Sequence, residues 1–363
     1  MELTRRSVLR MSYVVAIGGV LQACAAPASA PAAAPTSPPA PAPTTAAAAK
    51  PTSALAPTAA PTVLSKPGAL PKLTVSYGSP VGSFAALWMA KAINAFDKYG
   101  VTVDVQYIET ATAVPAMVSN NIDAEEVSAA PIITADANGD LDLVLIGSAL
   151  NHPILGLYTV PEITNADQLR GKVVATDKPG TPADYAARLA LSLMGLTTTD
   201  VDYRIVGSAA EVTPAMLSGQ VPAGVVAPPQ SFQVEAKGFH LLQSIFDQPY
   251  QNVGIVARTS RLDELGPSLK ALLAAVRDGI QAWFAQPDLA MRIIDEYAKI
   301  GDAAILQKTY DFYTQTAPFE PSLQPTMSGI KAMMDFLAPS VPKLAGLTPE
   351  RFVDTRLLTQ LPM

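Results

Sequence analysis

The sequence of 363 residues has only one cysteine, Cys24, and two histidines, His152 and His240. A single cysteine excludes an intrachain disulfide bond and a metal cluster built from several thiolates. Positive charge is sparse as well, because 25 Lys and Arg are scattered along the chain against 31 Asp and Glu, which gives a net charge of −6. Without a basic stripe for the phosphate backbone, no nucleic-acid partner is expected.

Catalytic and metal-binding motifs are also missing. The chain has no HExxH or GxSxG motif near either histidine. Glu125 and Glu126 are neighbours, and neighbours on a strand point to opposite faces of a sheet, so they cannot act as a catalytic pair. The acidic run DANGDLD at residues 136–142 does not have the glycine and distal glutamate of a calcium-binding EF-hand loop in their places. We therefore expect no catalytic residue, no metal and no cofactor.

The N-terminus has the pattern of an export signal. Arginines precede an apolar run at residues 11–23 that is too short to span a bilayer comfortably. The stretch TRRSVLR resembles a twin-arginine signal, and LQAC at residues 21–24 resembles a bacterial lipobox. These resemblances imply a signal peptide at residues 1–23 and lipidation of Cys24, which would become the first mature residue. A simple signal peptide with an incidental cysteine is the alternative.

A long segment rich in Ala, Pro and Thr follows the cysteine. Such a segment has too little large apolar surface to offset the entropy of ordering, and its prolines favour extended polyproline conformations. We therefore assign residues 24–71 to a tether and expect the folded part to begin at about Lys72. The roughly 290 residues beyond it are enough for two lobes.

The folded part alternates β-rich runs with helical patterns. Residues 72–79 (KLTVSYGS) and 101–110 (VTVDVQYIET) are typical of strands, and residues 80–100 carry the apolar spacing of an amphipathic helix. A helix at residues 113–119 and a strand at residues 122–130 are expected next. This alternation predicts an α/β fold with a parallel sheet.

An internal repeat is the most informative feature of the sequence. Three pairs of stretches recur in the same order at an offset of 98 or 99 residues: PAMVSNNIDA at 115–124 with PAMLSGQVPA at 214–223, VDVQYIET at 103–110 with VDYRIVGS at 201–208, and Gly82-Ser83 with Gly180-Thr181. They indicate two copies of one strand–turn–helix–strand–helix–strand unit. Because a solenoid needs at least three short repeats, two long copies predict a pair of lobes.

These stretches, from YGSPVGSFAALWMAKAINAFDKYG to PAMLSGQVPAGVVAPP, resemble the solute-binding proteins of ABC importers in the nitrate, sulfonate, taurine and thiamine-precursor group. The resemblance is close over residues 72–258 and less diagnostic in the helical tail. It implies a type II periplasmic-binding-protein fold of two α/β lobes joined by a two-strand hinge. The expected divisions are lobe I at residues 72–158, lobe II at residues 162–248, and residues 256–363 as a return to lobe I with C-terminal helices. The hinge is expected at LYTVPEI and QNVGIVA.

The resemblance also implies a function. The protein would be exported, anchored through a lipid on Cys24 to the outer face of the cytoplasmic membrane, and active as a monomer. It would capture a small-molecule ligand between its lobes and deliver it to an ABC permease and its ATPase subunits. The implied ligand is a sulfonate-, nitrate- or taurine-like anion or a thiamine-precursor-like heterocycle. No arginine is obviously placed for a bidentate clamp on a strong anion, which keeps a heterocycle or weakly anionic molecule open.

Two other classes of function remain as alternatives. Fungal thiamine-pyrimidine synthases are similar to this family, but they carry a cysteine-rich active-site motif, and this chain has no cysteine after Cys24. We therefore expect binding without catalysis. A non-transport surface lipoprotein is the second alternative, but it would need neither the repeat nor a polar cleft.

Candidate binding residues follow from the repeat, because ligands of open α/β sheets bind beyond the carboxyl ends of the strands. Gly82-Ser83 and Gly180-Thr181 hold that position, where glycine permits close backbone approach and helix-start amides favour a polar acceptor. We predict that the two pairs form a ligand clamp, with ordinary helix caps as the alternative. Lys178 offers a charge to an anion, or is a solvated loop lysine. The remaining candidates end other strands or begin the clamp helices: Phe84, Thr110, Ser128, Ala129, Tyr185, Ser208 and Pro228.

Overall fold

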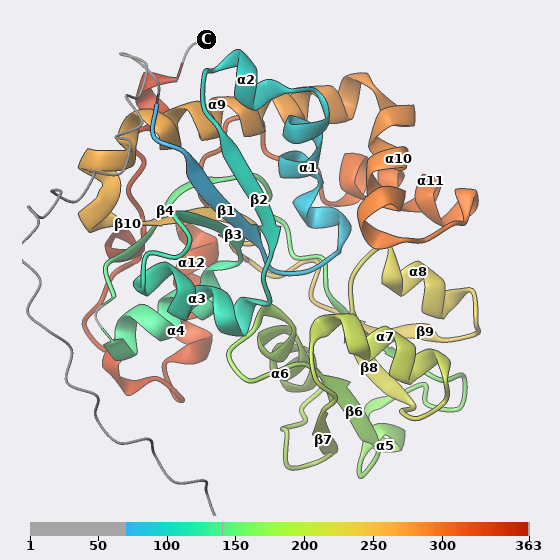
Figure 1. The fold of residues 1–363 in the computed structure, drawn as a ribbon. Coiled ribbons are helices and arrows are strands. Elements are labelled where there is room, and N and C mark those ends of the chain that lie inside the picture. The colour runs from blue at the N-terminus through green and yellow to red at the C-terminus, as the bar shows by residue number, and fades with distance from the viewer. Residues whose placement is uncertain (1–69, 140, 362–363) are drawn as a thin grey trace, which may run out of the picture. The chain divides into compact units, whose positions relative to one another are not determined.

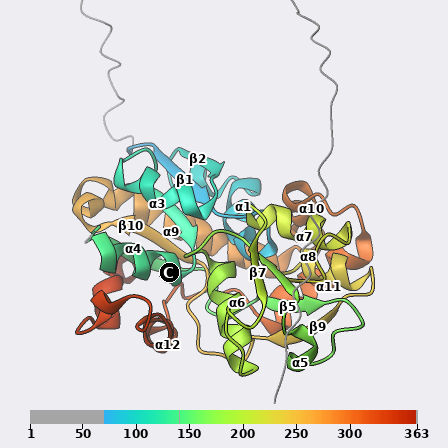
Figure 2. The same cartoon turned by 90° about the horizontal axis from the view of Figure 1, so that it is seen from below.

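The structure is a computed structural model that describes residues 70–139 and 141–361. The predicted signal peptide, Cys24 and nearly all of the tether at residues 24–71 lie outside the described residues. Two five-stranded sheets with helices packed on them make up the described part of the chain (Figures 1 and 2). No helix within this part combines the length and apolar character needed to cross a bilayer.

The first sheet is the centre of lobe I and has the strand order β2-β1-β3-β10-β4. Its faces are covered by α1 and α9 on one side and by α3, α4 and α12 on the other, as Figure 1 shows. Helices α10 and α11 follow α9 beside α1. The elements are β1 (Leu73–Tyr77), α1 (Ala85–Ala92), α2 (Ala95–Lys98), β2 (Val103–Tyr107), α3 (Thr110–Val118), β3 (Ala124–Val127), α4 (Ala129–Gly139), β4 (Leu143–Ser148), β10 (Gly254–Arg258), α9 (Leu262–Ala285), α10 (Pro287–Ala298), α11 (Ala303–Asp311) and α12 (Met327–Leu337).

The second sheet is the centre of lobe II and has the strand order β7-β6-β8-β5-β9. Its elements are β5 (Gly156–Thr159), α5 (Ala166–Leu169), β6 (Val173–Thr176), α6 (Pro182–Leu193), β7 (Asp202–Ile205), α7 (Ala209–Leu217), β8 (Ala223–Val226), α8 (Gln230–Glu235) and β9 (His240–Ser244).

The two sheets repeat one topology, in agreement with the internal repeat of the sequence. The order β2-β1-β3 of lobe I corresponds to β7-β6-β8 of lobe II, and α3 and α7 carry Pro115 and Pro214 at matching positions. The sheets are mixed, whereas the alternation predicted a parallel sheet. Strands β10 and β5 run antiparallel to both of their neighbours. Each of these strands is the first to enter its sheet after the chain has crossed from the other lobe, and it therefore arrives in the opposite direction.

Lobe I is held together by an unusually close helix contact beneath β1. Six of the eight residues of α1 are buried, because the helix lies between the sheet and α9. Gly279 makes this approach possible, since a Cβ at that position would lie 2.2 Å from the carbonyl oxygen of Ala86. The loop that follows β1 leads through residues 82–84 directly into this packed helix.

The lobe crossings differ in position from those expected at residues 157–163 and 251–257. Strand β5 pairs with β8 and β9 in the second sheet, and β10 pairs with β3 and β4 in the first. The crossings are therefore residues 149–155 and 245–253. An apolar β-rich run predicts a strand but not its partner, which depends on pairing with residues far away in the sequence.

The two crossing segments are joined by hydrogen bonds. The amide of Ala149 donates to the carbonyl of Val253 at 2.8 Å, and the side-chain amide of Asn252 donates to the carbonyl of His152 at 2.6 Å. The buried side chain of Gln251 also ties the second segment to the end of β4, because its Nε2 donates to the Ser148 hydroxyl at 2.7 Å. The two segments thus form one connection between the lobes.

Candidate functional site

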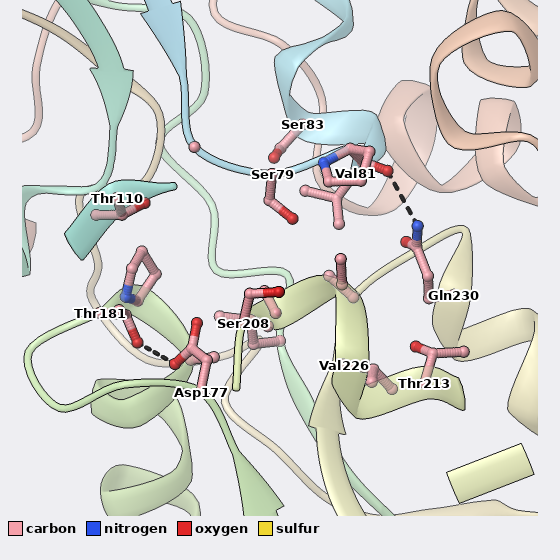
Figure 3. A pocket seen from close by; sticks show the side chains of 18 of the residues that line it. Ser79, Val81, Ser83, Thr110, Asp177, Thr181, Ser208, Thr213, Val226 and Gln230 are labelled. Carbon is pink, nitrogen blue, oxygen red and sulfur yellow. Dashed lines mark hydrogen bonds between the residues drawn. The ribbon is translucent and has the colours of Figure 1, made fainter. Parts of the chain in front are cut away.

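A cavity of about 370 Å³ lies where the carboxyl ends of the two sheets face each other. Three strand ends of lobe I (β1, β2 and β3) and three of lobe II (β6, β7 and β8) contribute residues to its lining, and both crossing segments contribute as well. Figure 3 shows side chains from both lobes pointing toward one another across this space. This cavity is the candidate site, and it has the position that the sequence predicted for a ligand.

The lobe I wall is built by the loop after β1 and the start of α3. Ser83 and Phe84 are buried at the end of the loop and line the cavity. Thr110, the first residue of α3, lies against Gly78, where a Cβ would be only 2.3 Å from the threonine Oγ1. Glycine at position 78 therefore lets the Thr110 hydroxyl reach the lining. Ser128, directly after β3, completes this wall.

The lobe II wall is organised around the start of α6. Thr181 is the N-cap of this helix, and its hydroxyl oxygen accepts a hydrogen bond from the Asp184 amide at 3.2 Å. Pro182 follows at the first helical position, where its fixed φ suits a helix start. The Thr181 hydroxyl also makes a hydrogen-bond contact with the carboxylate of Asp177, the residue directly after β6. Thr181 thus caps the helix and holds a buried acid at the cavity wall.

Ser208 is the corresponding cap of α7. Glu211 forms a capping box with it, and the carboxylate of Glu211 accepts the Ser208 amide at 2.6 Å. Gly207, with φ of 125°, gives the chain the turn that leads into this cap. The N-termini of both helices at the lobe II wall, α6 and α7, are therefore capped by side chains of this protein.

Several contacts cross from one lobe to the other around the cavity. Lys178 Nζ lies 2.8 Å from Glu109 Oε2, which forms an ion pair between the two walls. The Gln230 side-chain amide donates to the carbonyl of Pro80 at 3.0 Å, as Figure 3 shows. The carbonyl of Pro228 accepts the Tyr313 hydroxyl at 3.0 Å. The lobes therefore face each other in direct contact.

Asp177 is the buried ionisable group of the lining. Only 5% of its surface is exposed. Burial raises the pKa of Asp177 to about 6, the hydrogen bond from Thr181 opposes this rise, and the negative charge of Asp184 adds to it. The carboxyl group therefore changes protonation state near neutral pH.

Six of the predicted binding residues line the cavity: Ser83, Phe84, Thr110, Ser128, Thr181 and Ser208. The other five lie beside it. The Gly82 amide donates to the carbonyl of Pro228 at 3.2 Å, the Gly180 amide donates to Asp184 Oδ2 at 3.0 Å, and the Ala129 amide donates to the carbonyl of Gln251 at 3.1 Å. Tyr185 packs in the core against Tyr250 and Phe336. Ligand contact by any of the eleven residues stays a prediction.

Sequence reasoning missed Asp177 and Gln230. Asp177 could have been found, because it is the first residue after β6, the strand that leads to the predicted clamp turn. Gln230 gave no such signal, since its link to Pro80 joins residues 150 positions apart. Lys178, which the sequence offers as a charge for a ligand anion, pairs with Glu109 in the structure.

Neither histidine is part of the cavity lining. His240 lies on β9 with its Nε2 3.3 Å from the Thr159 hydroxyl, and His152 lies in the first crossing segment. Within residues 70–139 and 141–361, no three His, Cys, Asp or Glu side chains are grouped in a way that could hold a metal ion.

Comparisons with known proteins agree with this architecture. A family model described as NMT1/THI5 like matches residues 82–290. No curated protein matches the sequence.

Solved structures with the same fold include two sulfonate-binding proteins. The periplasmic aliphatic sulphonate binding protein SsuA from Escherichia coli is 18% identical, with a TM-score of 0.63 over 80% of this chain and 92% of that one. The alkanesulfonate-binding protein SsuA from Xanthomonas axonopodis pv. citri is 16% identical, with a TM-score of 0.65 over 80% and 98%. The periplasmic nitrate-binding protein NrtA from Synechocystis PCC 6803 is 16% identical, with a TM-score of 0.61 over 80% and 88%. At these identities the similarity is one of fold.

Proposed function

The chain belongs to the NMT1/THI5-like family, and from this premise we propose that it is the solute-binding lipoprotein of an ABC importer. Its fold is the type II periplasmic-binding-protein fold, with two α/β lobes and C-terminal helices that return to lobe I. The observation that carries the proposal is the cavity of about 370 Å³ at the strand ends of both lobes. A cavity of this size suits a small organic molecule.

The hinge supports capture by closure. Two hydrogen-bonded crossing segments connect the lobes, so one lobe can rotate against the other around them. A ligand that contacts both walls stabilises the closed arrangement by its preferential binding to it. The closed protein would then deliver the ligand to a permease whose ATPase partners supply the energy.

We propose binding without catalysis. The lining offers hydroxyls, a buried acid and apolar side chains, but no histidine or cysteine. Thr181 and Ser208 both serve as helix caps, and their hydroxyls contact the carboxylates of Asp177 and Glu211 rather than an imidazole of the kind that commonly activates a nucleophile. The chemistry of the lining therefore favours a molecule that is bound and released unchanged.

Native mass spectrometry of the gently purified full-length protein tests this function. We expect a co-purified small molecule at a 1:1 ratio, which denaturation releases and prolonged incubation leaves unaltered. The matched control is Ala209→Trp, because Ala209 lines the cavity at the start of α7 and an indole there would fill it. Chemical conversion of the bound molecule, or equal binding by Ala209→Trp, would contradict the proposal.

The proposed lipid anchor needs a separate experiment. Cys24→Ser should abolish lipid labelling and move the protein from the membrane fraction to the soluble fraction, with unchanged thermal unfolding. A mutant that still fractionates with membranes would show that the anchor lies elsewhere.

A further inference from the structure

The charges of the cavity lining do not suit a strong anion. Only three lining residues carry charge, namely Glu109, Asp177 and Lys178, and none is an arginine. The single ammonium group is already paired, since Lys178 Nζ lies 2.8 Å from Glu109 Oε2. What remains without a charged partner in the lining is the carboxylate of Asp177. An entering sulfonate or nitrate would meet this negative charge with no free cation to balance it.

Three backbone amides near the strand ends are also taken. The Gly180 amide donates to Asp184 Oδ2 at 3.0 Å, and the Ser208 amide donates to Glu211 Oε2 at 2.6 Å. Gly180 lies two residues before α6 and Ser208 is the N-cap of α7, so these amides are two of the donors that an anion could use there. Their present acceptors are themselves carboxylates, which would repel a second negative charge. On the lobe I side, the Gly82 amide donates to the carbonyl of Pro228.

Acceptor atoms that could receive a hydrogen bond from a ligand are available in the lining. Figure 3 shows one carboxylate oxygen of Asp177 meeting Thr181 while the other points into the cavity, toward the side where Thr110 and Ser79 lie. The buried Oε1 of Gln230 has no hydrogen-bond partner among the described residues, although its Nε2 donates to Pro80. A buried acceptor without a partner is unfavourable, so a ligand that donates a hydrogen bond here would be favoured.

The rest of the lining is largely apolar. Aliphatic and aromatic side chains from both lobes and both crossing segments contribute to it, among them Val81, Phe84, Leu155, Leu217, Val226 and Val253. These surfaces suit the hydrocarbon body of a ligand whose polar end is a donor.

We propose, on the basis of the solute-binding function proposed above, that the cavity selects an organic amine whose cationic nitrogen pairs with Asp177 and whose apolar body fills the remaining space. The charge-assisted hydrogen bond to a buried carboxylate supplies both affinity and orientation. The same carboxylate, together with the three occupied amides, discriminates against sulfonates and nitrate.

A matched series of probes tests this selectivity. The full-length protein is titrated by calorimetry with 3-phenylpropylamine, 3-phenylpropanol and 3-phenylpropane-1-sulfonate, which share one apolar body and differ in the charge of the head group. We expect the amine to bind roughly tenfold or more tightly than the alcohol, and the sulfonate to bind more weakly than either. Binding of the sulfonate as tight as that of the amine would overturn the proposal while leaving solute binding in place.

The variant Asp177→Asn separates the carboxylate from the shape of the site. It keeps an oxygen that can accept the Thr181 hydroxyl, so folding should survive, and thermal unfolding verifies this. We expect the preference for amine over alcohol to disappear in Asp177→Asn and to persist in Asp167→Asn, whose side chain is 92% exposed on α5. An unchanged preference in folded Asp177→Asn would overturn the proposal. If the variant fails to fold, the probe series on the unmodified protein decides the question.

The co-purified molecule provides an independent measurement. A basic nitrogen in it would support the proposal, and its absence would overturn the amine assignment even though the protein binds a solute. If no molecule co-purifies and none of the three probes binds, the solute-binding function itself is contradicted, and the inference with it.

Discussion

Lys178 Nζ in lobe II lies 2.8 Å from Glu109 Oε2 in lobe I, so one ion pair connects the two walls of the cavity. Glu109 immediately precedes α3, and Lys178 lies between β6 and α6. The hydrogen bond with Glu109 is the main cause that raises the pKa of Lys178, which favours the ammonium form of the lysine. The ion pair lies at the exposed edge of the site, because the two side chains are 46% and 37% exposed.

Removing this ion pair should favour separation of the lobes. In the full chain with Cys24→Ser, spin labels at Asp167→Cys in lobe II and Asp263→Cys in lobe I would report the distance between the lobes, because both side chains are more than nine-tenths exposed. We expect Lys178→Ala to shift the closed-to-open ratio by about two- to fivefold, as for an exposed ion pair. Lys331→Ala, which breaks the surface pair with Asp335 on α12, is the control. Identical distance distributions for Lys178→Ala and the unmodified protein would show that the pair does not contribute to closure.

Thr181→Ala should act mainly on stability. The substitution removes the N-cap side chain of α6. We expect the free energy of unfolding, measured by urea denaturation, to fall by about 0.5–2 kcal/mol. The substitution also removes a hydrogen bond that lowers the pKa of Asp177, so that pKa should rise further above 6. Thr181→Ser retains the hydroxyl and should restore both properties. If Thr181→Ala unfolds at the same urea concentration as the unmodified protein, Thr181 is not an effective cap.

Gly82→Ala should disturb the contact between the lobes. A Cβ at position 82 would lie 2.4 Å from Cε2 of Tyr313, whose hydroxyl donates to the carbonyl of Pro228 in lobe II. We expect a loss of about 1–3 kcal/mol in unfolding free energy, typical of overpacking. The double variant with Tyr313→Leu, which removes the ring, should recover part of the lost unfolding free energy. Gly266→Ala is the control, because its nearest neighbour would be at 3.8 Å. Equal stability of the two single variants would contradict this account.

Much of this architecture could be predicted from local patterns. The repeated stretches predicted the paired lobes, and the rule that ligands bind at the carboxyl ends of strands led to six of the lining residues, Thr110 and Ser208 among them. Both inferences need only periodicity and the order of elements along the chain.

The strand partners and the acceptors of some backbone amides could not be predicted, because they depend on pairing between residues far apart in the sequence. No local pattern indicates that β5 pairs within the sheet of lobe II, or that the Gly82 amide donates to the carbonyl of Pro228. The clamp prediction counted helix-start amides as free, since their acceptors are known only from the folded chain. For Gly180 and Ser208 the acceptors are nevertheless near in sequence, at Asp184 and Glu211, so the sequence itself carries this signal.

Binding of the amine probe should depend on pH through Asp177. The charged groups near this carboxyl are Asp184 on α6, whose charge raises its pKa, and Lys178, which is paired with Glu109. With a pKa of about 6, Asp177 is ionised at pH 8 and largely protonated at pH 5, while the amine remains cationic. Affinity for 3-phenylpropylamine should therefore fall about tenfold from pH 8 to pH 5, as calorimetry can measure. Asp177→Asn should give a flat profile, and a parallel fall in that variant would assign the effect to another group.

Two buried glutamates lead to the last prediction. Glu125 and Glu126 are fully buried in β3, and neither carboxyl oxygen of either residue has a hydrogen-bond partner among the described residues. Glu126 is in register with Tyr77 on one side and Ile255 on the other, so it lies in the middle of the sheet of lobe I. Burial raises the pKa of both glutamates well above the usual range. The folded protein therefore holds protons that the unfolded chain releases.

The sign of the effect on stability follows. When the pKa in the folded state is the higher one, the stabilisation is complete below the unfolded pKa and is lost as pH rises toward the folded pKa. Glu126→Met removes the carboxyl group and with it both the pH-dependent loss of stability and the unpaired oxygens. The variant should therefore raise the unfolding free energy at pH 8 by about 1–3 kcal/mol. The gain should shrink toward pH 4, where the glutamate is protonated in both states. Urea unfolding at pH 4, 6 and 8 measures this, with the exposed Glu264→Met as the control. A loss of stability at pH 8 in Glu126→Met would mean that the carboxyl group supports the fold through a contact of its own.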